Sequence, residues 1–309
     1  MEAIAPEGLQ GVAGSSDSRM FPRISGAGIG LRTCHIDQVL RDRPNVSWFE
    51  LLADNHLATG GLVPAQVEAV RAEYPLALHC VDMNLGGSDP LDLDYLERVR
   101  DLRDRSAAAW VSDHLCFTAV DGRNYHDLLP IPYTDEALRR VAERVLTIQD
   151  FFGDRLLVEN VSSYLRFAES PLTEAQFLRA LAQEADCHLL MDVNNLYVNH
   201  INHGDELAAY LESLPLDRVR EIHLGGYEPK DGYLLDAHNN PVSEPVWALY
   251  AQAVGLLPGV PTLIEWDNDI PAFAVLQSEA AKATGIAAPL AEREKEKRDR
   301  LGPRIRGVA

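Results

Sequence analysis

The fold is decided by RLLVEN (residues 155–160) and HLLMDVNN (188–195), which flank the helical stretch 174–184. Each segment is a short apolar run that ends on a carboxylate, Glu159 in the first and Asp192 in the second. Short, uniformly apolar runs are typical of strands buried on both faces of a parallel sheet. The stretch between them has apolar residues at helical spacing. These segments therefore predict a strand–helix–strand unit with carboxylates at the strand ends.

The same alternation continues along the whole chain. Expected strands cover residues 26–31, 47–52, 76–80, 108–112, 155–159, 188–192, 218–224 and 262–265. Helical patterns between them include 91–105 and 136–151, with starts expected at Asp89-Pro90, Thr134 and Thr173. Eight strands separated by helices predict a single α/β (β/α)₈ TIM barrel. An open doubly wound sheet is the alternative, but Gly26–Gly30 lacks the dinucleotide-binding glycine spacing.

Composition places the chain among ordinary globular proteins. It has 309 residues, of which 46% are hydrophobic and 24% charged. We expect a disordered N-terminal leader at 1–20, a TIM-barrel catalytic domain at 21–285 and a charged C-terminal helix or tail at 286–309. The leader lacks the basic start and apolar core of a signal peptide, and no apolar run approaches the roughly 20 residues of a membrane span. A cytoplasmic protein without a membrane partner is the expectation.

Charge and cysteine content narrow the classes of function further. The formal net charge of −19 repels phosphate backbones, which argues against nucleic acid as a ligand. The four cysteines form no Cys-x-x-Cys pair and lie in or beside apolar runs. A disulfide framework and a structural zinc site are therefore both poorly supported, and reduced, buried cysteines are expected.

Ionisable residues stand at the ends of most of the expected strands. In chain order these are Asp54-Asn55-His56, His79, Asp113-His114, Glu159-Asn160, Asp192 to Asn195, His223, Asp236-Ala237-His238, and Glu265 with Asp267. The active sites of such barrels lie at the carboxyl ends of the strands. A single His or acidic residue there is usually a rim residue or a helix cap. Burying the whole set without a counter-charge would cost several kcal/mol for each group, and bound cations remove that cost.

The donor atoms indicate the kind of metal only in part. Imidazole, carboxylate and amide ligands without thiolate exclude an iron–sulfur cluster and suit iron, manganese or zinc. Ligand chemistry alone favours neither zinc-dependent hydrolysis nor iron-dependent oxidation clearly over the other.

The order of the strand-end residues resembles that of xylose-isomerase-like barrels, in particular the trinuclear zinc endonucleases for abasic DNA. Longer motifs are similar to those of the multinuclear non-heme iron-dependent oxidative enzymes, a family long catalogued as a domain of unknown function. They span residues 26–271 and read LHCVDMNLGGSDPLD (78–92), VSDHLCFT (111–118), HDLLPIPYT (126–134), LLVENVSSYL (156–165), LLMDVNNLYVNHINHG (189–204), EIHLGGYE (221–228) and PTLIEWDNDIP (261–271). The family includes the methanobactin-, bufferin- and 3-thiaglutamate-biosynthesis enzymes.

This resemblance implies a ligand set at nine positions. His79 and His114 would hold one iron, and Glu159 would bridge it to a second. Asp192, His223 and Glu265 would complete the second iron, so these six residues are the expected catalytic set. A third, weaker ion would take Asp236 and His238 with help from Asn195, which stands where the trinuclear nucleases have a histidine. An amide oxygen is a poorer ligand than an imidazole, so partial occupancy is expected there.

Other residues are expected around these ligands. Asp113 is a candidate to accept a hydrogen bond from a metal ligand or to bridge two metal ions. His126 and His203 lie in polar loops and are candidates for the substrate pocket. Asn55, His56, Asn160 and Asp267 are further candidates for supporting ligands or for lining the pocket. The histidines His35, His188 and His200 are expected to be structural. Aromatic residues near strand ends, namely Tyr197, Tyr227, Trp266 and Trp110, are candidates for a peptide groove.

The resemblance also implies an activity. Two or three iron ions, with a mixed-valent Fe(II)/Fe(III) pair and O₂ as co-substrate, would modify a cysteine in a ribosomally synthesised precursor peptide. Outcomes known in the family include cysteine β-carbon excision and thiooxazole or oxazolone formation. A small peptide-recognition protein is the expected partner, as a heterodimer. Asp54-Asn55-His56 and Ser112-Asp113-His114 depart from the commonest family pattern and suggest a branch such as the 3-thiaglutamate enzymes.

Two other functions remain open at this point. One is a metal-dependent hydrolase or endonuclease of the abasic-site type, against which the acidic composition argues. The other is a non-catalytic metal- or peptide-binding protein. Open coordination positions distinguish a catalytic site from a closed structural one.

Overall fold

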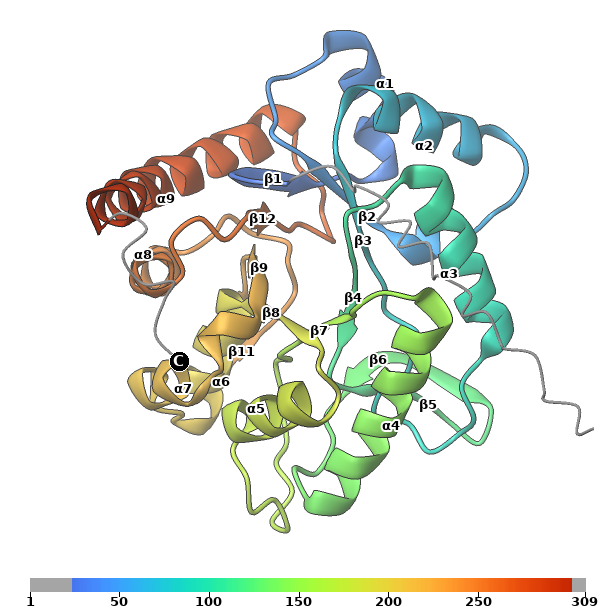
Figure 1. Cartoon of the computed structure of the whole chain (residues 1–309), viewed down its shortest axis with the longest axis vertical. Helices are drawn as coiled ribbons and strands as arrows, with labels where there is room; N and C mark the ends of the chain where they lie inside the picture. Colours follow the sequence, from blue (N-terminus) through green and yellow to red (C-terminus); the bar gives the residue numbers. More distant parts are fainter. Residues whose placement is uncertain (1–23, 302–309) are drawn as a thin grey trace, which may run out of the picture.

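A computed structural model describes residues 24–301, in which eight parallel strands close into a barrel with helices outside it (Figure 1). Around the barrel the strand order is β1-β12-β9-β8-β7-β4-β3-β2. The strands are β1 (Ala27–Gly30), β2 (Phe49–Leu52), β3 (Leu76–His79), β4 (Val111–His114), β7 (Leu157–Glu159), β8 (His188–Asp192), β9 (Val219–Leu224) and β12 (Thr262–Ile264). The predicted (β/α)₈ barrel is confirmed. The predicted leader at 1–20 lies outside the described residues.

Parallel pairing brings the predicted ligands to matching levels of neighbouring strands. His114 of β4 is in register with Glu159 of β7, and Asp192 of β8 is in register with His223 of β9. Because parallel strands end at the same edge of a barrel, these registers place the side chains at one mouth.

The helices form the outer layer and begin and end with recognisable caps. They are α1 (Thr33–Asp42), α2 (Leu62–Glu73), α3 (Leu93–Ser106), α4 (Asp135–Phe152), α5 (Glu174–Glu184), α6 (Val193–His203), α7 (Leu207–Ser213), α8 (Glu244–Leu256) and α9 (Phe273–Leu301). Thr134 caps α4, and Thr173 forms a capping box with Gln176 at the start of α5, as the sequence predicts. Helix α9 continues through residue 285, where we expect the barrel domain to end.

Two sequence-based boundaries are wrong. The strand expected at 108–112 is β4 at Val111–His114, because α3 ends in a left-handed residue at Ala107 and the next three residues carry the chain back to the barrel. The start of α3 is capped by Asp92, whose side chain accepts a hydrogen bond from the Tyr95 N–H, and not by Asp89-Pro90. The Asp89 carboxylate instead accepts from the backbone of residues 121 and 122.

Short elements inserted after the barrel strands were not predicted. An antiparallel hairpin of β5 (Phe117–Val120) and β6 (Arg123–Leu129) follows β4, and a second hairpin of β10 (Glu228–Lys230) and β11 (Tyr233–Leu235) follows β9. The 3₁₀ turns are η1 (Ala53–His56) and η2 (Leu216–Arg218). Both hairpins extend from the carboxyl ends of barrel strands, so they build up the rim of the mouth that carries the ionisable residues. Within residues 24–301, no helix is both long enough and apolar enough to cross a bilayer.

A cluster of tryptophans fills part of the barrel. Trp48 is fully buried, packs against Ala77 and Leu263, and meets Trp110 edge to face with 5.6 Å between ring centroids. Gly28 of β1 lies directly against the Trp48 ring, so that a Cβ at this position would approach the ring to 2.4 Å. The indole therefore requires glycine at residue 28.

The substitution Gly28→Ala should lower the free energy of unfolding by about 1–3 kcal/mol, because the added methyl group forces the buried indole out of place. Urea denaturation of the metal-free chain measures this change. Gly255→Ala in α8 is the matched control, since nothing lies within 4 Å of its added Cβ and alanine is the better helix former. Equal stability of the Gly28→Ala chain and the wild type would contradict the packing account.

Candidate metal centre

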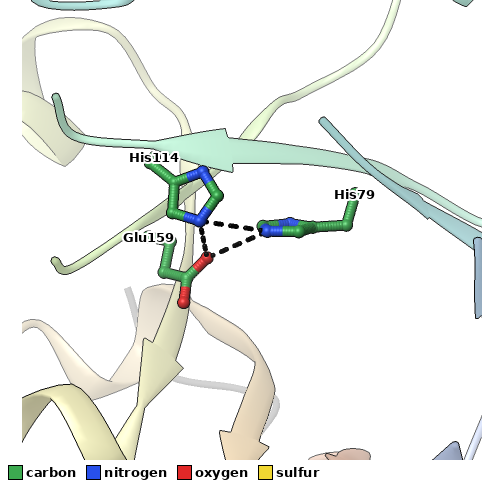
Figure 2. Close-up of side chains that lie close together, drawn as sticks. All are labelled: His79, His114 and Glu159. Carbon is green, nitrogen blue, oxygen red and sulfur yellow. Dashed lines mark hydrogen bonds and ion pairs between the residues drawn. The ribbon is translucent and has the colours of Figure 1, made fainter. Parts of the chain in front are cut away.

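Three buried side chains from neighbouring strands converge at the carboxyl mouth, as Figure 2 shows. His79 Nε2 lies 3.2 Å from His114 Nε2, and these atoms lie 3.4 and 3.3 Å from Glu159 Oε2. Donors held about 2.0–2.1 Å from one metal ion at tetrahedral angles are about 3.3–3.4 Å apart. The three atoms thus have the spacing of ligands around a single ion. We call this group the first position.

A hydrogen bond orients the His79 ring of the first position, and the Asp113 carboxylate lies beside the His114 ring. Ser112 Oγ donates to the Leu78 carbonyl at 3.3 Å, which leaves its oxygen to accept from His79 Nδ1 at 2.8 Å. With the proton on Nδ1, the Nε2 lone pair of His79 points at the centre. His114 Nδ1 lies 3.4 Å from the Asp113 carboxylate, which also accepts from the backbone N–H groups of Met83 and His114. Asp113 therefore supports His114 and does not face the centre.

A second group of four residues shares Glu159 with the first. Glu159, Asp192, His223 and Glu265 place one donor atom each within 4.8 Å of the others, and all four are buried. His223 Nδ1 lies 3.0 Å from Glu265 Oε2 and 3.9 Å from Glu159 Oε1. Because Glu159 Oε2 belongs to the first position, the two oxygens of this carboxylate face two separate donor sets. We call the four-residue group the second position.

Asp192 has a double role at the second position. It is the N-cap of α6, and its Oδ1 accepts a hydrogen bond from the Asn195 backbone N–H. Its Oδ2 is buried and has no hydrogen-bond partner. The local strand-to-helix turn thus aims one carboxylate oxygen into the mouth while the other is held by the backbone.

The third group centres on His238. Its Nδ1 lies 3.4 Å from Glu265 Oε2 and 3.1 Å from Asp267 Oδ2, while its Nε2 lies 2.8 Å from Asp236 Oδ1. Asp236 also accepts hydrogen bonds from Asn194 and Ser162. The structure thus adds Asp267 to the residues that we expect around a third ion. We call His238, Glu265 and Asp267, with Asp236, the third position.

Asn195 is oriented beside these groups. Its side-chain NH₂ donates to the Asn160 carbonyl at 3.1 Å, and its Oδ1 is buried without a partner. Asn160 itself joins β7 to β8 by two hydrogen bonds with the backbone of Asp192. Asn160 is therefore structural in this arrangement, whereas the Asn195 amide oxygen remains available as a ligand.

The buried charges perturb one another strongly. Burial raises the pKa of Glu159 well above its usual range, although His114 and His223 oppose the rise. Burial and neighbouring His114 lower the pKa of His79. For His238, burial lowers the pKa, but Asp236 and Glu265 outweigh it and the net direction is upward.

Buried ligand atoms without hydrogen bonds gather at these positions. Such atoms include Glu159 Oε2, Asp192 Oδ2, Asn195 Oδ1 and His238 Nε2, and also His223 Nε2 and Glu221 Oε1. Cations bound at these positions would supply the missing partners of the oxygens, and imidazole and carboxylate donors suit iron, manganese or zinc. The residues present therefore fit a multinuclear metal centre.

The sequence analysis missed three charged residues near the centre. Glu50 of β2 and Glu221 of β9 each place a carboxylate oxygen 3.4 Å from His223 Nε2, and both are buried. Burial, followed by repulsion from Glu221, raises the pKa of Glu50 to about 8. The buried guanidinium of Arg32 pairs with Asp267 and lies 3.8 Å from Glu265. A charged residue inside an apolar strand, as in FELL (49–52), is the signal that could have revealed Glu50.

The remaining candidates lie farther from the ligands or have other partners. Asn55 is exposed on η1, and His56 beside it is buried with its Nδ1 unpartnered. His126 lies on exposed strand β6 and not in a loop, and His203 at the end of α6 bonds to Ser163. The three histidines expected to be structural are His35 with its Nε2 bonded to the Pro271 carbonyl, His200 with its Nδ1 bonded to the Asp205 carbonyl, and His188 at the amino end of β8.

Two of the four aromatic groove candidates are packed elsewhere. Trp110 belongs to the tryptophan cluster, and Trp266 is buried. Tyr197 of α6 and Tyr227 after β9 are half-buried and stack on each other, with ring centroids 5.6 Å apart. They remain the candidates for contact with a bound peptide.

A cavity of about 520 Å³ lies beside the centre and is separate from the three positions. Residues 163–176, which follow β7, and α7 form much of its wall, together with Asn199 of α6. Inside it, the Glu174 carboxylate accepts hydrogen bonds from the hydroxyls of Tyr133 and Tyr210. Its volume is in the range of small-ligand and side-chain pockets.

Solved structures support the fold. The chain is similar to an L-ribulose 3-epimerase, with a TM-score of 0.56 and 12% identity over 92% of this chain and 100% of that chain. It is also similar to a xylose isomerase-like TIM barrel/4-hydroxyphenylpyruvate dioxygenase fusion protein, with a TM-score of 0.54 and 14% identity over 93% of this chain and 46% of that chain. At such identities the likeness establishes a xylose-isomerase-like TIM barrel and nothing about the reaction.

Sequence relatives are much closer. The chain is 51% identical to a UPF0276 protein of Acaryochloris marina, over 84% of this chain and 94% of the relative. It is 45% identical to a UPF0276 protein of Anaeromyxobacter sp., over 86% of this chain and 94% of the relative. The profile of the RiPP precursor modification enzymes MbnB/TglH/ChrH, which act on ribosomally made peptides, matches residues 26–288. This chain belongs to that family of RiPP precursor modification enzymes.

Proposed function

We propose that this protein is an iron- and O₂-dependent oxidase that modifies a cysteine in a ribosomally synthesised precursor peptide. The observation that carries the proposal is the position of Glu159, whose two carboxylate oxygens face two different sets of buried donors. Such a shared carboxylate suits a pair of ions held close together. Membership of the precursor-peptide modification family supplies the substrate class.

The first and second positions differ in their ligands. The first position offers two imidazoles and one carboxylate oxygen, and the second offers three carboxylates and one imidazole. The second position therefore concentrates negative charge and suits the ion of higher charge, which is the arrangement a mixed-valent Fe(II)/Fe(III) pair requires. When bound, such a pair would let O₂ serve as the oxidant of the cysteine. The barrel fixes the donors and shields them from water.

A peptide can reach the centre from the rim of the mouth. The stacked Tyr197 and Tyr227, the exposed strand β6 and the cavity beside β7 all lie on segments that follow barrel strands. We infer that the precursor peptide lies over this rim with its cysteine directed at the first and second positions. A small recognition protein that presents the peptide is part of the proposal, as is a cytoplasmic location.

The third position differs from the other two in the strength of its ligands. Its ligands would be His238 with Glu265 and Asp267, or with Asp236, and the adjacent amide oxygen of Asn195 is a weak donor. We infer a labile third ion at this position. A product of the 3-thiaglutamate type is proposed separately, from the departures at Asp54-Asn55-His56 and Ser112-Asp113-His114.

A hydrolase is the second candidate, because the nearly tetrahedral spacing of the first position also suits zinc. The net charge of −19 disfavours a nucleic-acid substrate. Zinc in place of iron in the purified protein, together with cleavage of abasic DNA, would support this candidate over the oxidase.

Metal content should respond differently to two alanine substitutions. Glu159→Ala should lower the metal bound at both the first and second positions, because it removes the shared carboxylate, whereas His79→Ala should lower it at the first position only. Elemental analysis after loading with Fe(II) under anaerobic conditions measures the number of ions per chain. His35→Ala is the control, since its ring bonds to the Pro271 carbonyl and should leave the count unchanged. Identical losses in all three variants would contradict the assignment.

Turnover should be lost in Glu159→Ala and in His79→Ala. The iron-loaded protein, incubated in air with a cysteine-containing precursor peptide and its recognition partner, should change the peptide mass and consume O₂. His79→Ala should reduce this rate at least 100-fold, because the first position loses a ligand. Mass spectrometry and an oxygen electrode follow the reaction. A peptide unchanged by the iron-loaded wild type, with no iron retained on purification, would refute the oxidase.

A further inference from the structure

Buried carboxylates lie on both sides of the His223 imidazole. Its Nδ1 lies 3.0 Å from Glu265 Oε2 in the second position. On the opposite side of the ring, Nε2 lies 3.4 Å from Glu50 Oε1 and 3.4 Å from Glu221 Oε1. The side chains of His223, Glu50 and Glu221 are 0%, 3% and 0% exposed. The two glutamates thus stand behind the ligand and form no part of the first, second or third position.

The fold holds Glu221 firmly, whereas Glu50 Oε2 is buried without a hydrogen-bond partner. Glu221 and His223 are two residues apart on β9, so both side chains point to the same face of the strand. Trp110 Nε1 donates a hydrogen bond to Glu221 Oε2 at 2.7 Å, which leaves Oε1 directed toward the imidazole. Glu50 reaches the same nitrogen from β2. Burying two carboxylates without a partner costs free energy. The His223 imidazole is the group that both of them approach.

We propose that Glu50 and Glu221 are positioning residues that hold His223 with its Nε2 proton directed away from the centre and its Nδ1 lone pair directed into the second position. The inference rests on the proposed metal centre. An imidazole whose outer N–H faces carboxylates is a stronger donor through its other nitrogen, and its ring cannot rotate to present the wrong one. Ser112 and Asp113 serve the first position in the same way, but with a hydroxyl and a single carboxylate.

A fourth ion bound by Glu50, Glu221 and His223 Nε2 is the competing account, since these atoms lie within 4.8 Å of one another. It would require His223 to bind ions through both ring nitrogens and to lose both ring protons. It would also set an ion beside a carboxylate that the Trp110 indole already engages. Positioning requires neither condition.

The test uses the full chain and the isosteric variants Glu50→Gln and Glu221→Gln, loaded with Fe(II) and dialysed against a chelator. Each variant should retain iron at the first position and bind it about 10–100-fold more weakly at the second. Mössbauer spectra distinguish the two positions and should show an altered signal at the second only. Glu174→Gln is the matched control, because Glu174 is a partly buried carboxylate that accepts from two tyrosines and lies outside all three positions.

Three results would overturn the inference. The first is unchanged iron affinity in both variants. The second is equal loss from both positions together with a lowered melting temperature, which would make the pair merely structural. The third is loss of an extra metal equivalent while the second position stays filled, which would establish a fourth ion. Should Glu221→Gln fail to fold, Trp110→Phe keeps both carboxylates, releases Glu221 and should weaken the second position to a smaller extent. A wild type that binds no iron would remove the proposed function as well, whereas an iron-loaded wild type with unaffected variants removes this inference alone.

Discussion

The carboxyl mouth of the barrel is organised around the carboxylate of Glu159. It is buried at the end of β7, with Oε2 among the histidines of the first position and Oε1 toward His223 of the second. Strand register sets this arrangement, because His114 stands level with Glu159 on one side and Leu190, two residues before Asp192, stands level with it on the other. A shift of one residue in β7 would turn Glu159 out of the barrel.

Charge balance explains the composition around this carboxylate. Glu50, Asp192, Glu221 and Glu265 are also buried nearby, and Arg32 pairs with Asp267 and lies near Glu265. Histidines offset some of these charges, and bound cations would offset more of them. The two principal positions differ as a result: imidazoles dominate the first and carboxylates dominate the second. Such unlike surroundings would favour ions of unlike charge at the two positions.

The segments proposed to contact the peptide follow the barrel strands and do not form part of them. The two hairpins and the loop after β7 extend from the carboxyl ends of strands, where insertions leave the closed barrel intact. Residues 163–173 of the cavity wall and Tyr227 lie on such segments, whereas Tyr197 lies on helix α6.

Sequence by itself determined the barrel and most of the strand ends, because apolar runs ending on His, Asp or Glu are a local pattern. Helix α5 and strand β8 match their predicted bounds, and Thr173 is the N-cap of α5, as the sequence predicts. What only the tertiary structure decided is which groups meet across the barrel. Glu50 and Glu221 lie in strands that are far apart in the chain, and their convergence on His223 depends on barrel closure. The hairpins and the role of Asp267 likewise depend on long-range contacts, which no local pattern encodes.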